Sequence, residues 1–337
     1  TTPASLMAAA TVNIPSIILS GGPMLNGFYK EKKAGSGTIL WEARRLLSKN
    51  EINYDEFMNM VAASAPSIGH CNTMGTALSM NSLAEALGMS LPGCAAIPAP
   101  YKERAQISYE TGFRIVEMAY ENLLPSDIIK KESLINTIKV ASAIGASSNA
   151  PPHLIAIAKH SNIDLNLNDW EKFGEKIPLL VNLQPSGEHL GEDFYKSGGV
   201  PVVMKELLLN NELDESCLTV TGKTVGQNLK EINNNENNII KKFSNPLKKN
   251  SGFLVLKSNF FDSAIMKISV VSQDFKKRYL SNKNKPNEFT VRAIVFEGPE
   301  DYHKRINDQK LNIDENCILI IRGCGPIGYP GSAEVVN

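Results

Sequence analysis

The sequence has 337 residues, with 35 Lys plus Arg against 35 Asp plus Glu, and 42% of its residues are hydrophobic. This length predicts two domains with ample apolar material for burial. The neutral charge balance excludes the basic footprint of a protein that binds nucleic acid or an anionic membrane, so a small molecule is the expected partner. No apolar stretch reaches the length of a membrane span.

The five cysteines lie at positions 71, 94, 217, 317 and 324 and form no Cys-x-x-Cys pair. This spacing argues against a disulfide framework and against a self-contained zinc site, and it indicates a reducing, cytoplasmic compartment. The first residue is Thr1 rather than an initiator Met, and no basic segment precedes the first apolar run. We therefore expect an internal fragment rather than a natural start.

The first predicted elements alternate as in an α/β protein. Residues 4–10 have a helical pattern, residues 14–19 form a short buried strand of β-branched type, and a glycine turn follows at residues 20–23. The turn lacks the Gly-x-Gly-x-x-Gly spacing, so a dinucleotide site is a weak alternative. Packing helices are predicted at residues 41–47 and 54–63, because apolar residues recur there at helical spacing.

Residues 66–98 contain Cys71, followed by Asn72, Thr73 and a helical pattern that stops at Gly88. We expect Asn72 or Thr73 to cap this helix, which would place the thiol beside unpaired backbone N–H groups. Two interpretations stay open. The thiol is either a buried structural cysteine before a core helix, or an anionic ligand-binding group favoured by the positive end of the helix.

Residues 141–160 are predicted to run from the end of a small-residue strand, through a polar turn, into a helix with two prolines at its start. Ser148 and Asn149 in the turn either hydrogen-bond a polyol or cap the helix. We expect His153 to be a satisfied core residue rather than a metal ligand or a base. Arg104 is expected to form an ion pair on a helix surface, with a bidentate contact to a substrate carboxylate as the alternative.

A strand is predicted at residues 177–183, followed by a loop, a short helix, a glycine turn and a further helix. The loop and short helix carry several adjacent polar residues that resemble a metal site. Successive loop residues seldom converge on one ion, so we expect them to be solvated: Glu188, His189, Glu192 and Asp193.

Composition changes after the first two thirds of the chain. Residues 229–251 are rich in Asn and Lys and predict a polar linker or surface excursion. Residues 252–337 contain short β-rich runs joined by one helical piece at 299–306. The predicted fold class is therefore α/β, with a layered domain containing a parallel sheet over residues 1–228 and an incomplete, truncated β-barrel domain after the linker.

Several motifs resemble one family. The strings GHCNTMGTA, GCAAIPAPYKERAQISYETG and GASSNAPPHL, together with GCGPIGYPG near the C-terminus, are similar to those of the iron–sulfur dehydratases. That family includes the dihydroxy-acid, phosphogluconate and aldonic-acid dehydratases. The second string resembles the sugar-acid branch, the arabinonate and xylonate dehydratases, more than the branched-chain amino-acid branch.

The resemblance implies a hydro-lyase that removes water from a sugar acid, such as arabinonate or xylonate, to give a 2-keto-3-deoxy acid. It implies that Cys71 is one of three ligands of a [2Fe–2S] cluster, that Glu334 binds Mg²⁺, and that Ser148 and Asn149 lie near the substrate. The family's serine base would lie beyond Asn337, and its Gly-Cys-Asp-Lys element would lie upstream of this chain.

Two other functions remain as alternatives: the dihydroxy-acid dehydratase of branched-chain amino-acid synthesis, and an inactive truncated remnant or binding module. One thiolate and one carboxylate cannot hold either inorganic centre alone, because metal affinity needs several converging ligands. We therefore expect the chain as given to be inactive. The resemblance also implies a homodimer or homotetramer for the intact protein.

Overall fold

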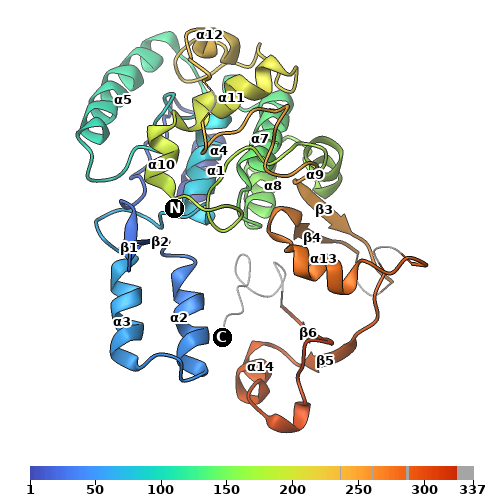
Figure 1. Ribbon diagram of the computed structural model, residues 1–337. Helices are drawn as coiled ribbons and strands as arrows, with labels where there is room; N and C mark the ends of the chain where they lie inside the picture. Colours follow the sequence, from blue (N-terminus) through green and yellow to red (C-terminus); the bar gives the residue numbers. More distant parts are fainter. Residues whose placement is uncertain (236, 260–261, 286–287, 325–337) are drawn as a thin grey trace. The chain divides into compact units, whose positions relative to one another are not determined.

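A computed structural model describes residues 1–235, 237–259, 262–285 and 288–324 (Figure 1). The chain divides into two compact units, Thr1–Val270 and Val271–Asn337. Within the described residues, no helix combines the length and the apolar character that a membrane crossing requires.

Four helices form the centre of the first unit: α1 (Thr2–Val12), α4 (Thr76–Ala86), α7 (Lys131–Ile144) and α8 (Ala150–His160). α1 packs against α4 and α8, and α4 also packs against α7. Residues 78–86 of α4 are all buried. Alanines and serines supply much of this helix, so neighbouring elements approach it closely on every side.

Six further helices belong to this unit: α5 (Lys102–Glu121), α6 (Pro125–Ile128), α9 (Leu167–Gly174), α10 (Gly191–Lys196), α11 (Gly199–Leu209) and α12 (Val225–Leu229). Local sequence explains their ends. The Thr224 side chain accepts from Gln227 N at the start of α12, and Asn166 does the same for Asn168 N at the start of α9. Figure 1 shows α5 at the edge of the unit.

A small helical hairpin has a core of its own. β1 (Gly27–Tyr29) and β2 (Lys32–Ala34) pair in antiparallel fashion and lead into α2 (Ile39–Ser48) and α3 (Tyr54–Ala63), which lie side by side in Figure 1. Its buried residues are Ala34, Ile39, Ala43 and Met60. This core is separate from the main core of the unit, so the hairpin stands apart from the central helices.

The first unit ends with a second antiparallel pair. β3 (Phe253–Leu256) and β4 (Ala264–Lys267) are followed by the 3₁₀ turn η1 (Ile268–Val270). Phe253 packs edge-to-face on Trp170 of α9, with ring centroids 5.2 Å apart. Because both rings are fully buried, this contact fixes the hairpin to the helical unit.

The second unit contains α13 (Gln273–Tyr279), β5 (Arg292–Phe296), α14 (Pro299–Arg305), η2 (Gln309–Leu311) and β6 (Cys317–Ile321). β5 and β6 are parallel, and α14 packs on β5. The buried residues of this unit are Ile294, Phe296 and Tyr302. The strands predicted from the β-rich runs are therefore confirmed, and so is the helix predicted at 299–306.

The prediction of a strand before Gly145 was wrong, because residues 141–144 form the last turn of α7. Buried small and β-branched residues suit a central helix as well as a strand, so composition alone did not separate the two. The strand predicted at 14–19 is also absent. Ile14 and Leu19 are exposed, and Ile18 N donates to Met89 O at 2.8 Å without a neighbouring strand to extend the pairing.

The parallel sheet predicted for residues 1–228 is not formed in the described part of that region, where β1 and β2 are the assigned strands. Residues 177–183 are extended but pair only at isolated positions, and the segment 239–248 lies along them. Leu179 N donates to Lys248 O at 2.9 Å, and Asn182 N donates to Ile239 O at 2.8 Å. The backbone of residues 177–183 is thus hydrogen-bonded by the Asn- and Lys-rich segment.

The β-barrel expected near the C-terminus stays a prediction, because its described strands occur in separate pairs.

Candidate functional site

The Cys71 thiol lies in a polar environment. Ser36 Oγ donates to Cys71 Sγ at 3.0 Å, and Thr73 Oγ1 lies 3.0 Å from the same sulfur. The residue is half-buried. Its sulfur faces two hydroxyls rather than the apolar core. The interpretation of Cys71 as a structural cysteine buried among core side chains is wrong.

Two glycines lie beside this sulfur. A Cβ atom at Gly37 would lie 2.8 Å from Thr73 Oγ1 and 3.4 Å from Cys71 Sγ. A Cβ atom at Gly75 would lie 3.6 Å and 3.9 Å from the same two atoms. A side chain at Gly37 would therefore crowd the Thr73 hydroxyl that contacts the sulfur, whereas one at Gly75 would make ordinary van der Waals contacts.

The predicted helix caps Asn72 and Thr73 were wrong. α4 begins at Thr76 with Gly75 as its N-cap residue, so Cys71 precedes the helix by several residues and the argument from its first N–H groups does not apply. Asn72 instead joins two loops. Its Oδ1 accepts from Ser36 N at 2.9 Å and its Nδ2 donates to Leu25 O at 2.9 Å. An amide used in this way is not available as a cap.

Gln184 connects the cysteine loop to two other loops. Its backbone carbonyl accepts from Met74 N at 2.8 Å, its Oε1 accepts from the Thr38 hydroxyl, and its Nε2 donates to Glu188 O at 3.2 Å. The following peptide bond to Pro185 is cis. Sequence reasoning missed Gln184 and Ser36 as partners of this loop, because nothing local in the sequence connects positions so far apart, and it named Thr73 only as a helix cap.

The turn at residues 145–149 meets the start of α4. Thr76 Oγ1 lies 3.2 Å from Ser147 Oγ and accepts from Asn149 Nδ2 at 2.8 Å, while Ser147 N donates to Ser79 Oγ at 2.9 Å. Asn149 is the N-cap residue of α8, but its side chain makes no capping bond. The capping alternative is therefore wrong for Asn149. Ser148 is exposed, and Thr76 is the hydroxyl that the sequence analysis missed.

A cleft of about 750 Å³ adjoins this cluster of hydroxyls. Its lining includes Gly22, Gly69, His70, Thr76, Asn81 and His153. His70 Nδ1 lies 2.9 Å from Cys71 O, and its Nε2 lies 2.9 Å from Asn81 Nδ2. Burial lowers the pKa of both His70 and His153, which favours neutral imidazoles. His153 lines the cleft, so the prediction that it is a core residue was wrong.

Arg104 is not the surface ion pair that the sequence predicted. Its guanidinium donates to the carbonyls of Ser20 at 2.7 Å and Cys94 at 3.0 Å, and also to that of Ile97. These carbonyls belong to the glycine turn at 20–23 and to the segment after α4. Arg104 thus holds together two loops behind the cleft, and its charge is satisfied by backbone dipoles.

Glu188 is exposed as predicted, but His189, Glu192 and Asp193 are anchored by contacts rather than solvated. Lys33 Nζ pairs with Asp193 Oδ2 at 2.5 Å and lies 3.0 Å from His189 Nδ1. Glu192 accepts from Tyr101 at 2.7 Å and from Lys196 at 2.6 Å. In the described part of the chain, no group of three His, Cys, Asp or Glu residues is placed to hold a metal ion. Glu334, the predicted Mg²⁺ ligand, lies outside the described residues.

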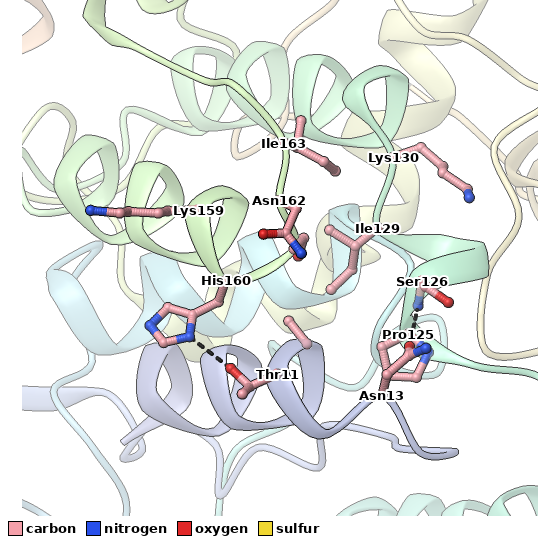
Figure 2. A pocket seen from close by; sticks show the side chains of 12 residues that line it. Thr11, Asn13, Pro125, Ser126, Ile129, Lys130, Lys159, His160, Asn162 and Ile163 are labelled. Carbon is pink, nitrogen blue, oxygen red and sulfur yellow. Dashed lines mark hydrogen bonds between the residues drawn. The ribbon is translucent and has the colours of Figure 1, made fainter.

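A second cleft of about 610 Å³ lies at the other end of α1 (Figure 2). His160 Nδ1 lies 2.7 Å from Thr11 Oγ1 there, and Asn13 Oδ1 accepts from Ser126 N at 2.9 Å. Figure 2 shows Lys159 and Lys130 at its margins. The lining of this second cleft contains no thiol and no carboxylate. The first cleft is lined by residues near the start of α1 and the second by residues near its end, so the two clefts are separate.

The other cysteines of the first unit do not join Cys71. Cys94 is buried and lies 3.6 Å from Arg104 Nη1. Burial and nearby acidic groups raise the pKa of Cys217 to about 12, which disfavours the thiolate that a metal requires. Cys317 and Cys324 belong to the second unit. Among the described cysteines of the first unit, Cys71 is therefore the one that lies in the candidate site.

The chain belongs to the dihydroxy-acid/6-phosphogluconate dehydratase family. Residues 1–228 match the N-terminal region of that family, and residues 238–337 match its C-terminal region. The two matched regions together span both units. The polar cleft and the Cys71 loop lie within the N-terminal family region.

Individual relatives are similar over the whole chain. The D-xylonate dehydratase of Caulobacter vibrioides is 55% identical over 337 residues, and the L-arabinonate dehydratase of Rhizobium leguminosarum bv. trifolii is 44% identical over 338 residues. The dihydroxy-acid dehydratase of Clostridium botulinum is 34% identical over 336 residues. These alignments cover 100%, 100% and 99% of this chain but 56%, 56% and 58% of the relatives. The chain thus spans little more than half of their length.

Proposed function

We propose that the intact protein is a hydro-lyase that dehydrates a sugar acid, an aldonate such as xylonate or arabinonate, to a 2-keto-3-deoxy acid. The observation that carries this proposal is the Cys71 thiol, held between the Ser36 and Thr73 hydroxyls beside Gly37. The higher identity to the xylonate and arabinonate dehydratases than to a dihydroxy-acid dehydratase supports a sugar acid as the substrate.

We propose that Cys71 provides one thiolate to a [2Fe–2S] cluster and that Glu334 provides one carboxylate to Mg²⁺. When bound, these groups would supply a Lewis acid for the departing hydroxyl and a hard cation for the substrate carboxylate. The Ser36 and Thr73 hydroxyls lie within hydrogen-bond distance of Cys71 Sγ and suit a thiolate, because hydrogen bonds to an anion stabilise it.

The chain's own hydroxyls and amides would bind the polyol part of the substrate. Thr76, Ser147 and Asn149 form a connected cluster beside the cleft, and each can exchange a hydrogen bond with a neighbour for one with a substrate hydroxyl. We also propose Ser148, which is exposed on the same turn, as a substrate contact. The neutral imidazoles of His70 and His153 add hydrogen-bonding groups to the cleft without adding charge.

A substrate panel tests the proposed reaction. The intact protein, purified and reconstituted without oxygen, is assayed with arabinonate, xylonate, gluconate and dihydroxyisovalerate, and the keto-acid product is measured. We expect turnover of a five-carbon aldonate. Turnover of dihydroxyisovalerate alone would establish the branched-chain alternative, and no turnover with a full complement of cluster would support a remnant or a binding module.

The 337-residue chain alone is expected to bind no stoichiometric cluster and to be inactive, since Cys71 is the thiol that lies in the site. Anaerobic reconstitution followed by iron and sulfide assay checks this. The intact protein, reconstituted in parallel, is the control. Two irons and two sulfides per short chain, roughly the full content of such a cluster, would contradict the prediction.

We propose that residues 1–228 are a cluster-binding domain, residues 229–251 a polar excursion, and residues 252–337 the start of a second domain. The N-terminal family region ends at residue 228, which supports the first of these boundaries. The C-terminal family region begins at residue 238, within the proposed excursion, and the first compact unit extends to Val270. We also propose a cytoplasmic location, supported by five free thiols.

We propose a homodimer or homotetramer, with the outer face of α5 in the interface. Four large side chains lie exposed along one stripe of this helix: Tyr109 (65%), Phe113 (59%), Val116 (54%) and Tyr120 (89%). Their spacing of four, three and four residues reads the same in both directions, so two antiparallel copies of α5 would present matching stripes.

Phe113→Glu is therefore expected to lower the sedimenting mass of the intact protein by half or more, because it places a charge in the centre of the apolar stripe. Trp41→Glu, at an exposed apolar position on α2, is the matched control and should leave the mass unchanged. Sedimentation velocity measures both. An unchanged oligomer in the folded Phe113 variant would exclude this face from the interface.

A further inference from the structure

Lys267 is a half-buried cation that faces a backbone carbonyl. Its Nζ donates to Gly145 O at 2.7 Å. Gly145 is the C-cap residue of α7 and has a left-handed backbone, with φ of 62°. Its carbonyl lies at the negative end of the helix dipole, where a cation is stabilised. Lys267 thus binds the residue at which the turn 145–149 begins.

The charge of Lys267 is costly to keep. Burial and the nearby Lys248 lower the pKa of Lys267 to about 8. In the part of the chain that the structure describes, no carboxylate lies within ion-pair distance of its Nζ. An apolar side chain of similar length would fill the same space without this penalty. The contact made by its ammonium group, rather than packing, therefore accounts for a lysine at position 267.

The same hairpin makes a second contact beside the first. Ser269 Oγ, two residues after Lys267, lies 3.0 Å from Ser186 Oγ, and Lys248 donates to the Ser269 carbonyl. A Cβ atom at Gly145 would lie 3.2 Å from Ser186 Oγ, so the two loops touch at this point. The hairpin end therefore fixes the turn 145–149 and the loop after Gln184 together.

Both loops lead directly into the candidate site. The turn 145–149 carries Ser147 and Asn149, which bind Thr76 beside the cleft. The Gln184 carbonyl holds Met74 in the loop that contains Cys71. Lys267 itself touches neither the cleft lining nor the cysteine in the described contacts, so any effect on the site must pass through these loops.

We propose that Lys267 is a positioning residue: by binding the Gly145 carbonyl it holds the turn 145–149 in the geometry that presents Ser147 and Asn149 to the hydroxyls of a polyhydroxy acid. This role rests on the proposed dehydratase function. It connects the region matched by the C-terminal family region, where Lys267 lies, to the substrate turn of the N-terminal region.

The kinetic test compares Lys267→Met and Lys267→Arg in the intact, cluster-loaded protein. We expect Lys267→Met to raise KM for the aldonate about tenfold, with a smaller change in kcat and an unchanged iron content, because a loosened turn weakens substrate binding. Lys267→Arg retains a donor and a charge, and it should restore most of the affinity. Lys257→Met, at an exposed lysine beside the same hairpin, is the matched control and should match the wild type.

Two further measurements separate positioning from a purely structural role. The unfolding temperature of Lys267→Met at pH 7 should lie close to that of the wild type, because losing the bond to the Gly145 carbonyl and removing a half-buried charge act in opposite directions. In the 337-residue chain, which needs no cluster for this experiment, deuterium exchange of the 145–149 backbone should become roughly ten times faster. Unchanged exchange, an unchanged KM, or a KM loss that simply follows a lower unfolding temperature would overturn the proposal.

The outcomes also distinguish the two proposals from one another. If the wild type dehydrates no aldonate, the proposed function fails, while the exchange measurement still decides whether Lys267 orders the turn. If the wild type is active and Lys267→Met is indistinguishable from it in KM and in exchange, the positioning role alone fails.

Discussion

Cys71→Ser in the intact protein is expected to lower kcat by at least about 100-fold and to remove most of the bound iron. Loss of a residue that only hydrogen-bonds a metal ligand already costs up to about 100-fold in metal affinity or activity, so loss of the ligand itself should cost at least as much. A serine hydroxyl matches the thiol in size and keeps contact with Ser36 and Thr73, yet it is a poor ligand for iron. Iron and sulfide content, the visible absorbance of the cluster and kcat measure the effect.

Cys217→Ala is the matched control for this substitution. The Cys217 thiol has its pKa raised to about 12 by burial and by nearby acidic groups, and it lies 3.5 Å from Asn136 Nδ2, away from the Cys71 loop. We expect this variant to keep its cluster and its activity. An active Cys71→Ser protein with full iron content would contradict the assignment of Cys71 as a ligand.

Arg104→Met is expected to lower the free energy of unfolding by roughly 4 kcal/mol, because it leaves several buried carbonyls without the charged donor that each now binds. Each hydrogen bond to a charged group contributes about 1.5–3 kcal/mol, and these contributions are not fully additive. The affected carbonyls are those of Ser20, Cys94 and Ile97. Urea unfolding measures the change. The loops that these carbonyls belong to lie behind the cleft, so substrate affinity should fall as well.

Lys102→Met is the control on the same helix. Lys102 is an exposed residue in the first turn of α5, and its replacement should change stability by less than about 0.5 kcal/mol. Arg104→Lys gives a further comparison. It keeps the charge but not the planar fork, so it should recover only part of the lost stability. Equal stability of Arg104→Met and the wild type would show that water replaces the guanidinium.

Periodic segments could be predicted from the sequence alone. The helix predicted at residues 54–63 coincides with α3, and the β-rich runs near the C-terminus form β3, β4, β5 and β6. These segments show their apolar spacing locally, and the spacing follows from the geometry of the backbone itself. Residues 141–144 failed the same test, because a helix buried on all sides carries no polar face to reveal its period.

The sequence by itself determined which residue types were available to a site: a cysteine flanked by glycines, and hydroxyls and amides on a second turn. Only the tertiary structure decided that the Cys71 sulfur faces Ser36, that Asn149 binds Thr76 rather than capping its own helix, and that Lys267 donates to the Gly145 carbonyl. Local chain geometry sets the period of a helix or strand. Contacts between loops form only when the packing of the whole unit brings distant segments together, so no local pattern contains them.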